Sequence, residues 1–297
     1  MDFLILYEHK VRELENACLL KLELTRRGYE VEICNINADI EVRHLLGAKP
    51  KVIITPWLYS DRTVSFIHTK FGHVERIVNL QYEQVLSRKW EAVGYHTPKG
   101  MAQKGYHICW GQGTRMRLLN AGVCPENIVL TGSIQMDLLK PEFSGYYYTR
   151  DEVAQLYDIN PTKKWMLYIS SFTLASASRR KVDSLAKTVN TDVDDLFYSM
   201  KLSKEETIKW IERFLMENQD FVFIYRPHPN ESGDIDLDRL ANEYQNFRVI
   251  SDLSVKQWIK VSDHIYTWIS TAISEAYFAN KTCNILRPIP LSEDLDM

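Results

Sequence analysis

The sequence lacks a long apolar run, a paired-cysteine motif and a large excess of charge of either sign. Its apolar runs have the length of strands, far short of the roughly 18 residues that a bilayer-spanning helix needs. The five cysteines are scattered without a C-x-x-C pair, which argues against a disulfide framework and against a zinc site, and is typical of reduced thiols. The formal net charge of −3 excludes a strong field for nucleic acid or acidic membrane.

The amino terminus also lacks a basic segment before its first apolar run, and Asp2 interrupts that run, so we predict no signal peptide and a cytoplasmic protein. A chain of 297 residues exceeds one typical domain and fits two of about 100–200 residues each. Its 45% hydrophobic and 25% charged content is that of an ordinary globular protein. We therefore expect two domains, residues 1–145 and 146–297.

Strand-length apolar runs alternate with helical patterns along the chain, which predicts an α/β fold with parallel sheets. The predicted strands of the first domain are 3–7, 29–33, 51–54, 77–80, 104–110 and 128–130. Those of the second domain are 165–170, 221–225, 247–250, 265–269 and 283–286. Residues 174–202 show no clear period and are predicted to be an irregular insertion. The fold class is two Rossmann-like domains facing a cleft.

The stretch FVFIYRPHPNE, residues 221–231, carries the first candidate binding site. Its apolar start predicts a buried strand, and two prolines end that strand by excluding both a ladder and a helix. Arg226, His228 and Asn230 then lie at the carboxyl edge of a sheet, where open α/β folds bind ligands. A guanidinium and an imidazole suit a phosphate group, whereas the alternative is a proline-rich surface turn with incidental polar residues.

A second apolar strand, 265–269, runs into Ser270 and Thr271 and then into a helical pattern. Ser and Thr are favoured helix caps, and the first-turn amides of a helix attract anions, so these two residues are caps, phosphate ligands or both. Glu275 follows within the helix, where a carboxylate near a nucleotide commonly binds ribose hydroxyls.

Candidates for proton transfer lie in the first domain. Glu8 and Glu13 flank the predicted turn after the first strand, where Lys10 and Arg12 are candidates to bind an anionic acceptor. The alternative for each acid is helix-start chemistry, because a carboxylate near a helix N-terminus is stabilising without any function.

Glu83 follows the predicted strand 77–80, and His96 lies in the turn GYHTP with a side chain that titrates near neutral pH. Gly113 and Thr114 belong to a strand–GQGT–helix pattern that lacks the third glycine of a dinucleotide fingerprint. They are candidates for the lining of an acceptor or donor site. A lone loop histidine is, however, more often incidental than catalytic.

The two motifs, HP at residues 228–229 and Ser-Thr at 270–271, resemble the donor half of GT-B glycosyltransferases that use cytidine nucleotides. These include bacterial sialyltransferases, Kdo transferases and CDP-glycerol or CDP-ribitol phosphotransferases. The amino-terminal YEHKVRE and the TGS at 131–133 resemble bacterial surface-carbohydrate (capsule and lipopolysaccharide) biosynthesis proteins. The resemblance implies a CMP- or CDP-linked donor as co-substrate, bound by Arg226, His228, Ser270, Thr271 and Glu275, with no other cofactor and no metal.

Three functions remain open on this resemblance: a glycosyltransferase acting on a glycan hydroxyl, a polyol-phosphate transferase, and a non-catalytic glycosyltransferase-like subunit. The acceptor is expected to be a glycan or lipid-linked glycan. At most peripheral contact with the inner membrane face is expected, aided by the basic run 179–181, whose plainer explanation is a solvated loop. The sequence differs from the GT-B pattern at its carboxyl end, where a helix of these enzymes usually returns to the first domain. We therefore expect a shortened second domain or one without that helix.

Overall fold

The computed structural model describes residues 1–231 and 233–296, and these form two compact units. The first unit comprises Met1–Gln84 and His96–Leu138, and the second comprises Val85–Tyr95 and Leu139–Met297. The chain thus leaves the first unit at Leu138, near the predicted boundary at residue 145. It also contributes an eleven-residue excursion, 85–95, to the second unit.

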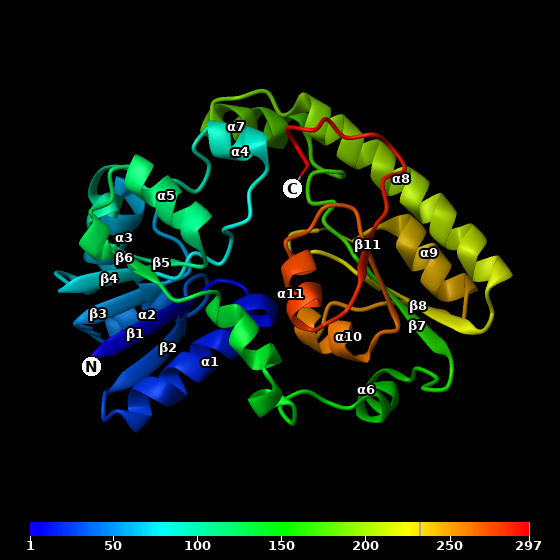
Figure 1. Ribbon diagram of the computed structural model, residues 1–297, viewed down its shortest axis with the longest axis horizontal. Coiled ribbons are helices and arrows are strands. Elements are labelled where there is room, and N and C mark those ends of the chain that lie inside the picture. The colour runs from blue at the N-terminus through cyan, green and yellow to red at the C-terminus, as the bar shows by residue number, and fades with distance from the viewer. Residues whose placement is uncertain (232, 297) are drawn as a thin grey trace. The chain divides into compact units, whose positions relative to one another are not determined.

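The first unit is built on a six-stranded parallel sheet with the order β2-β1-β3-β4-β5-β6 (Figure 1). All six strands were predicted, and they are β1 (Phe3–Tyr7), β2 (Val31–Asn35), β3 (Val52–Thr55), β4 (Arg76–Asn79), β5 (Tyr106–Cys109) and β6 (Ile128–Leu130). Its α-helices are α1 (Lys10–Arg26), α2 (Ile40–Leu45), α3 (Asp61–Phe71) and α5 (Gln112–Asn120).

Alternation along β1 divides the core of the first unit into two layers. Leu4 and Leu6 face a cluster that includes Ile67 of α3, whereas Ile5 faces one that includes Ala17 of α1. Successive side chains of a strand point to opposite faces, so an uninterrupted apolar strand has to be covered on both sides. This is why a continuous run such as FLILY predicts a sheet with helices on each face.

The second unit has a five-stranded parallel sheet with the order β11-β10-β7-β8-β9. Its strands, also predicted, are β7 (Lys164–Ile169), β8 (Phe221–Arg226), β9 (Phe247–Val249), β10 (His264–Thr267) and β11 (Cys283–Ile285). Its α-helices are α4 (Arg88–Ala92), α6 (Arg150–Tyr157), α7 (Arg179–Val189), α8 (Asp194–Glu217), α9 (Ile235–Glu243), α10 (Val255–Val261) and α11 (Ala272–Phe278).

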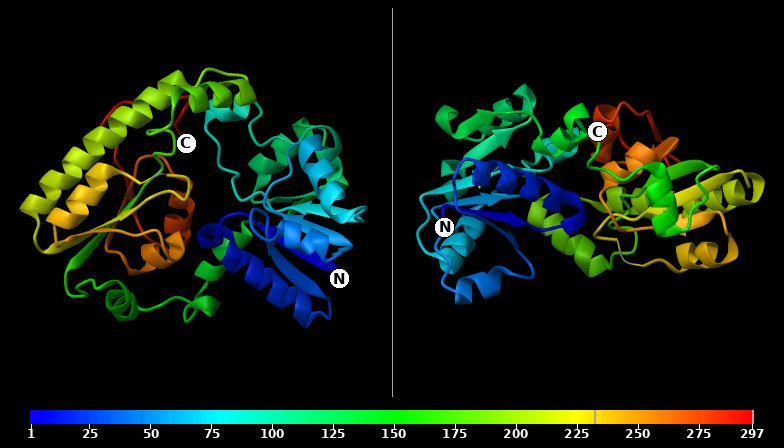
Figure 2. Two further views of the ribbon diagram at one scale, coloured as in Figure 1. Left: turned by 180° about the vertical axis from the view of Figure 1, so that it is seen from behind. Right: turned by 90° about the horizontal axis from the view of Figure 1, so that it is seen from below.

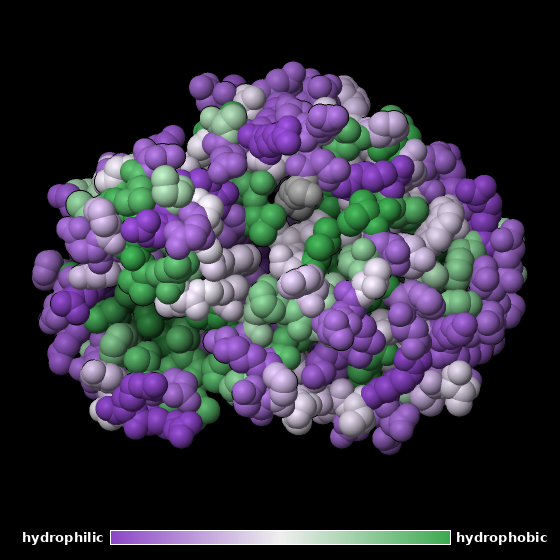
Figure 3. Space-filling model, in the orientation of Figure 1, coloured by the Kyte–Doolittle hydropathy of each residue, from purple (hydrophilic) through white to green (hydrophobic). Residues whose placement is uncertain are grey.

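The same alternation builds the second core. Tyr168 and Tyr225 pack on the face covered by α8 and α9, and Trp165 packs on the face covered by α10 and α11. The left view of Figure 2 shows the long helix α8 running along this sheet. The surface along α8 is mainly hydrophilic in Figure 3, as expected for a helix that buries only one stripe of side chains. The predicted α/β class with two Rossmann-like parallel-sheet units is confirmed.

The predicted irregular insertion at 174–202 is wrong, because the segment contains helix α7 and the first nine residues of α8. Ser178 caps α7 by accepting a hydrogen bond from the amide of Lys181. Val182 and Val189 then recur at the spacing of two helical turns and are buried together with Val193. The many Ser, Lys, Arg and Asp residues of the segment occupy the solvent face and obscure this period in the sequence.

Strand order places a topological switch point in each sheet, where ligands of open α/β folds bind outside the carboxyl ends of the strands. In the first unit the chain goes from β1 outward to β2 and then returns to β3 on the other side of β1. In the second unit the corresponding reversal lies between β7 and β10. The sites described below lie at these two sheet edges.

Candidate functional site

At the carboxyl edge of the first sheet, three charged side chains form a linked chain of ion pairs. Arg12 Nη1 lies 2.7 Å from Glu83 Oε1, and Arg12 Nη2 lies 2.7 Å from Glu13 Oε1. The second oxygen of Glu13 accepts the amide of Glu8 at 2.7 Å. The structure thus brings together three predicted residues that are up to 71 positions apart in the chain.

Among these ion-paired side chains, Glu13 supports Arg12. Its carboxylate is fully buried and accepts hydrogen bonds from Arg12 and from the turn that opens α1. Burial disfavours the charge of Arg12, but the carboxylates of Glu83 and Glu13 outweigh it and raise the arginine pKa. The arrangement keeps Arg12 charged and orients it toward Glu83, whose side chain is 37% exposed.

His96 lies next to Glu83 and extends this series of charged and polar side chains. Its Nε2 lies 3.7 Å from Glu83 Oε2, and its ring stacks on Tyr59 with a centroid distance of 4.6 Å and an interplanar angle of 9°. Burial lowers the pKa of His96, although the charge of Glu83 opposes this effect. This shift favours the neutral imidazole, the form that can accept a proton, and the ring lies between a carboxylate and an aromatic ring.

Four other predicted site residues belong to the first unit. Glu8 is half-buried and 4.0 Å from His9 Nε2, and Lys10 is exposed on the first turn of α1. Thr114 is buried, and its hydroxyl accepts a hydrogen bond from Arg117. Gly113 is exposed, and a Cβ added there would meet nothing within 4 Å, so no close backbone contact inside the unit requires glycine at this position.

In the second unit, Arg226 is buried at the carboxyl end of β8. Its guanidinium donates to the carbonyl of Asp252 at 2.7 Å and also to that of Leu253. Both carbonyls belong to the segment between β9 and α10, so Arg226 binds two neighbouring loops of the sheet edge together. Both of its terminal nitrogens thus contact backbone oxygens, and these contacts hold the neighbouring loop.

His228 and Asn230 follow in the same loop. The amide of Asn230 donates to His228 Nδ1 at 3.1 Å. A neutral imidazole that accepts at Nδ1 carries its proton at Nε2, so the loop orients this ring as an Nε2–H donor. Asn230 itself is exposed.

Ser270, Thr271 and Glu275 follow β10 at the same edge. Both β8 and β10 run parallel to β7, which lies between them, so the two predicted loops are separated by one strand. Ser270 Oγ accepts the amide of Ala272, the first residue of α11, at 3.1 Å, whereas the N-cap of this helix is Thr271, whose side chain makes no capping hydrogen bond. Thr271 is half-buried, and Glu275 is buried in α11.

Glu231, for which no role was predicted, organises the loop after β8. One carboxylate oxygen accepts hydrogen bonds from Ser170 Oγ at 2.6 Å and from the amides of Phe172 at 2.8 Å and His228 at 3.3 Å. The other lies 3.3 Å from the hydroxyl of Tyr225. Burial raises the pKa of Glu231. A lone acid after a proline-rich turn gives no such signal in sequence, because two of its donors, Ser170 and Phe172, come from the distant segment after β7.

Neither a metal-holding group of side chains nor a membrane-spanning helix occurs in the described part of the chain. Among residues 1–231 and 233–296, no group of three or more His, Cys, Asp or Glu side chains is placed to hold a metal ion. Over the same residues, no helix combines the length and apolar character needed to cross a bilayer. Of the basic run 179–181, Arg179 is paired with Asp183 and Asp194.

Comparison with known proteins gives similarity in fold. No family model and no curated protein sequence matches the chain. Among solved structures, Staphylococcus aureus MnaA in complex with UDP has a TM-score of 0.56 at 15% identity, over 97% of this chain and 79% of that one. The UDP-GlcNAc 2-epimerase of Neisseria meningitidis bound to UDP-GlcNAc has a TM-score of 0.56 at 12% identity, over 97% and 83%.

A variant of the wall teichoic acid polymerase TagF has a TM-score of 0.59 at 12% identity, over 95% of this chain and 69% of that one. At such identities the comparison establishes the architecture and not the reaction. The two Rossmann-like units of this chain have the GT-B type of fold that these carbohydrate enzymes share.

Proposed function

We propose that the protein is a glycosyltransferase of bacterial surface-polysaccharide synthesis, which transfers a sugar from a nucleotide-activated donor to a glycan hydroxyl. The observation that carries the proposal is the edge of the second sheet, where the loops after β8 and β10 present His228, Ser270 and Thr271 on either side of β7. The similarity of fold to enzymes that act on nucleotide sugars supports it.

In the second unit the donor nucleotide is bound by the two loops. His228 donates from Nε2 to a donor phosphate and stabilises the negative charge that grows on the leaving nucleotide. Ser270 and Thr271 contribute hydroxyl donors, Asn230 an amide, and Glu275 contacts the ribose. Arg226 acts on the donor indirectly, because it holds the neighbouring loop in place. The donor is CMP- or CDP-linked, by the resemblance of the HP and Ser-Thr motifs.

In the first unit His96 accepts the proton of the acceptor hydroxyl, and Glu83 stabilises the imidazolium that forms. Arg12 and Lys10 bind an anionic acceptor, and Gly113 and Thr114 line its site. Glu13 positions Arg12, and Glu8 is the alternative base. The chemistry proposed for these side chains is proton transfer and charge stabilisation, without a metal or a further cofactor. The acceptor is a surface glycan or a lipid-linked one, reached by peripheral contact with the inner membrane face.

The second candidate function is a polyol-phosphate transferase, because the fold resembles that of the wall teichoic acid polymerase TagF. The two functions differ in the atom attacked, which is an anomeric carbon in one and phosphorus in the other. Both place a nucleotide phosphate at the same sheet edge.

Calorimetric titration with CMP, CDP, UMP, UDP and GDP tests the donor site. The informative variant is His228→Asn, whose amide oxygen can replace Nδ1 as acceptor for Asn230 but cannot supply the Nε2–H donor. The matched control is His264→Ala at the amino end of β10, on the opposite edge of the same sheet. We expect CMP or CDP to bind the wild type and the control alike, and to bind His228→Asn at least about tenfold more weakly.

Tight binding of UDP in place of cytidine nucleotides would exclude the proposed donor class while leaving the sheet edge as the nucleotide site. Conversion of UDP-GlcNAc to its 2-epimer would replace the transferase by an epimerase. Absence of binding by all five nucleotides would contradict the donor site and favour the non-catalytic alternative.

A further inference from the structure

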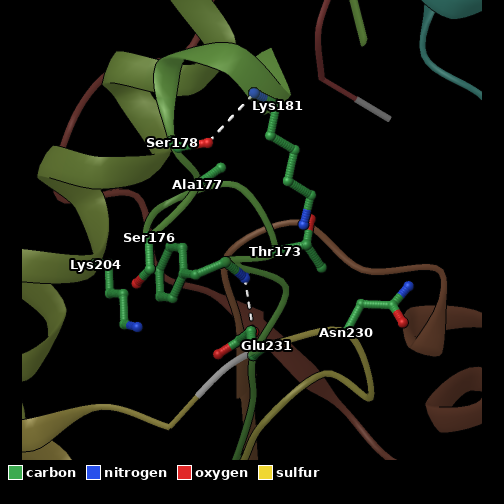
Figure 4. A pocket seen from close by; sticks show the side chains of 9 residues that line it. Thr173, Ser176, Ala177, Ser178, Lys181, Lys204, Asn230 and Glu231 are labelled. Carbon is green, nitrogen blue, oxygen red and sulfur yellow. Dashed lines mark hydrogen bonds between the residues drawn. The ribbon is translucent and has the colours of Figure 1, made fainter. Parts of the chain in front are cut away.

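Beside the loop after β8, the second unit has a cavity of about 150 Å³ that shares only Asn230 with the proposed donor site. Four segments contribute to its wall: the connection from β7 to α7, helix α7, helix α8, and the loop between β8 and α9. Figure 4 shows side chains from these segments converging on it. Its polar lining consists of Thr173, Ser176, Ser178, Lys181, Lys204, Asn230 and Glu231.

Two lysines give the cavity its positive charge. Lys204 comes from α8, its side chain is only 7% exposed, and its Nζ lies 2.6 Å from Asp234. Lys181 comes from the first turn of α7, and in Figure 4 its side chain extends toward Thr173. Asp234 offsets the charge of Lys204, so the other charged groups of this wall are Lys181 and Glu231. Burial of a lysine is costly unless the charge is paired, and Asp234 supplies the partner that keeps Lys204 charged beside the cavity.

Glu231 also lines the cavity, and its carboxylate would be expected to repel an anion. Its oxygens, however, already receive hydrogen bonds from Ser170 and from the amides of Phe172 and His228. These donors spread and offset the negative charge, and burial favours the protonated form by raising the pKa. The remaining polar groups of the wall are hydroxyls, the Asn230 amide and the two ammonium groups, which together form a set rich in donors.

The volume limits the ligand. A cavity of roughly 150 Å³ holds a molecule the size of benzene, whereas sites for drug-sized ligands span about 300–1,000 Å³. A complete nucleotide sugar is therefore too large, but a phosphate or carboxylate with a few attached atoms fits. We propose that this cavity is a binding site for one small oxyanion, held by Lys181 and Lys204 with hydrogen bonds from Asn230 and the neighbouring hydroxyls.

The oxyanion can belong to the nucleotide itself or to a second group, such as a carboxylate or phosphate on the donor or acceptor. Inorganic phosphate is the probe that separates these sources, because it carries the shared chemistry without the rest of either molecule. Its binding to the full chain is followed by phosphorus NMR line broadening and by calorimetry, first alone and then with saturating CMP or CDP.

Two variants and one control make the test specific. Lys181→Gln removes an exposed ammonium at the wall, and Lys187→Gln removes an equally exposed one from the last turn of the same helix, away from the cavity. Lys204→Met is combined with Asp234→Asn, so that no unpaired charge is left buried, and asparagine can still cap α9. We expect saturable binding to the wild type and to Lys187→Gln, and binding weaker by about fivefold to tenfold in each of the other two.

Competition by the nucleotide would support the site and assign the oxyanion to the nucleotide phosphate. Simultaneous binding would support the site and assign it to a second anionic group. The proposal is overturned if phosphate does not saturate the wild type, or if Lys181→Gln and Lys187→Gln bind it equally. Failure of the donor-site proposal is separate, because that depends on nucleotide binding and on His228.

Discussion

Each of the two sheet edges contains a buried acid, and the two acids have different kinds of partner. In the first unit Glu13 is ion-paired with Arg12, which also reaches Glu83, and Glu83 lies beside His96. In the second unit Glu231 receives hydrogen bonds mainly from neutral donors. A paired acid stays charged and orients its partners, whereas an acid among neutral donors fixes a loop. The first arrangement suits proton transfer and the second suits a rigid anion site.

The largest effect is expected from neutralising the paired acid. In Glu13→Gln the guanidinium of Arg12 loses one of its two carboxylates in a buried setting, and unfolding should be favoured by about 2–3 kcal/mol. Urea denaturation followed by a probe of the first unit measures this loss. Glu126→Ala, an exposed acid of the same unit, is the control and should stay within about 0.5 kcal/mol of the wild type. Equal effects of the two variants would contradict the structural role of Glu13.

A smaller effect is expected at His96. Because burial lowers its pKa, the folded protein binds fewer protons than the unfolded chain below the ordinary value of 6.5, and this part of the stability is lost as the pH falls through that value. NMR titration of the ring should give a pKa below 6.5. In Glu83→Gln the opposing charge is absent, and the pKa should fall further. A rise in that variant would show that Glu83 does not act on the imidazole.

The matching change in the second unit, Glu231→Gln, should cost less, about 1 kcal/mol or below. The amide oxygen can accept from Ser170 and Phe172, while the amide nitrogen can donate to the hydroxyl of Tyr225. Similar losses in Glu13→Gln and Glu231→Gln would remove the distinction between the two edges.

The pH dependence of Glu231→Gln sharpens the same comparison. Because the folded pKa of Glu231 is raised above 4.5, the native state binds more protons above that pH, and wild-type stability falls as the pH rises through the folded pKa. The glutamine cannot titrate, so its stability relative to the wild type should increase over this window and then level off. Urea denaturation at a series of pH values measures it, and a flat difference would contradict the raised pKa.

The smallest effect is expected at Gly113 in the first turn of α5. An added Cβ meets nothing within 4 Å, so Gly113→Ala should stabilise the first unit by about 0.5–1 kcal/mol through helix propensity. Thermal unfolding measures the gain. If the glycine is needed for close approach of the acceptor, the same variant should weaken acceptor binding without changing nucleotide binding.

The strands of this fold could be predicted from the local pattern of apolar residues and prolines. The strand at 221–226 and its end at Pro227 follow from apolar residues and from proline, and all eleven strands were predicted with shifts of a few residues at their ends. Helix α7 was missed because its buried stripe is narrow and its other residues are polar. The short helix α4 was missed because five residues carry too little periodicity.

The site was only partly predictable. Position after a strand correctly marked Arg12, Glu83 and His228 as sheet-edge residues, because parallel strands share one carboxyl edge. It did not show that Arg226 binds the carbonyls of Asp252 and Leu253. Nor did it indicate Glu231, which accepts hydrogen bonds from Ser170 and Phe172 in the segment after β7.

The sequence by itself determined the fold class, because apolar runs and helical periods are local properties, and it determined which residue types follow each strand. Tertiary structure alone decided the order of the strands and hence which of those residues meet. Ion pairing of Arg12 with Glu83, burial of Glu231 and the cavity between Lys181 and Lys204 all join segments distant in the chain. The charge state of a side chain depends on such neighbours and on its distance from water, and neither is a property of local sequence.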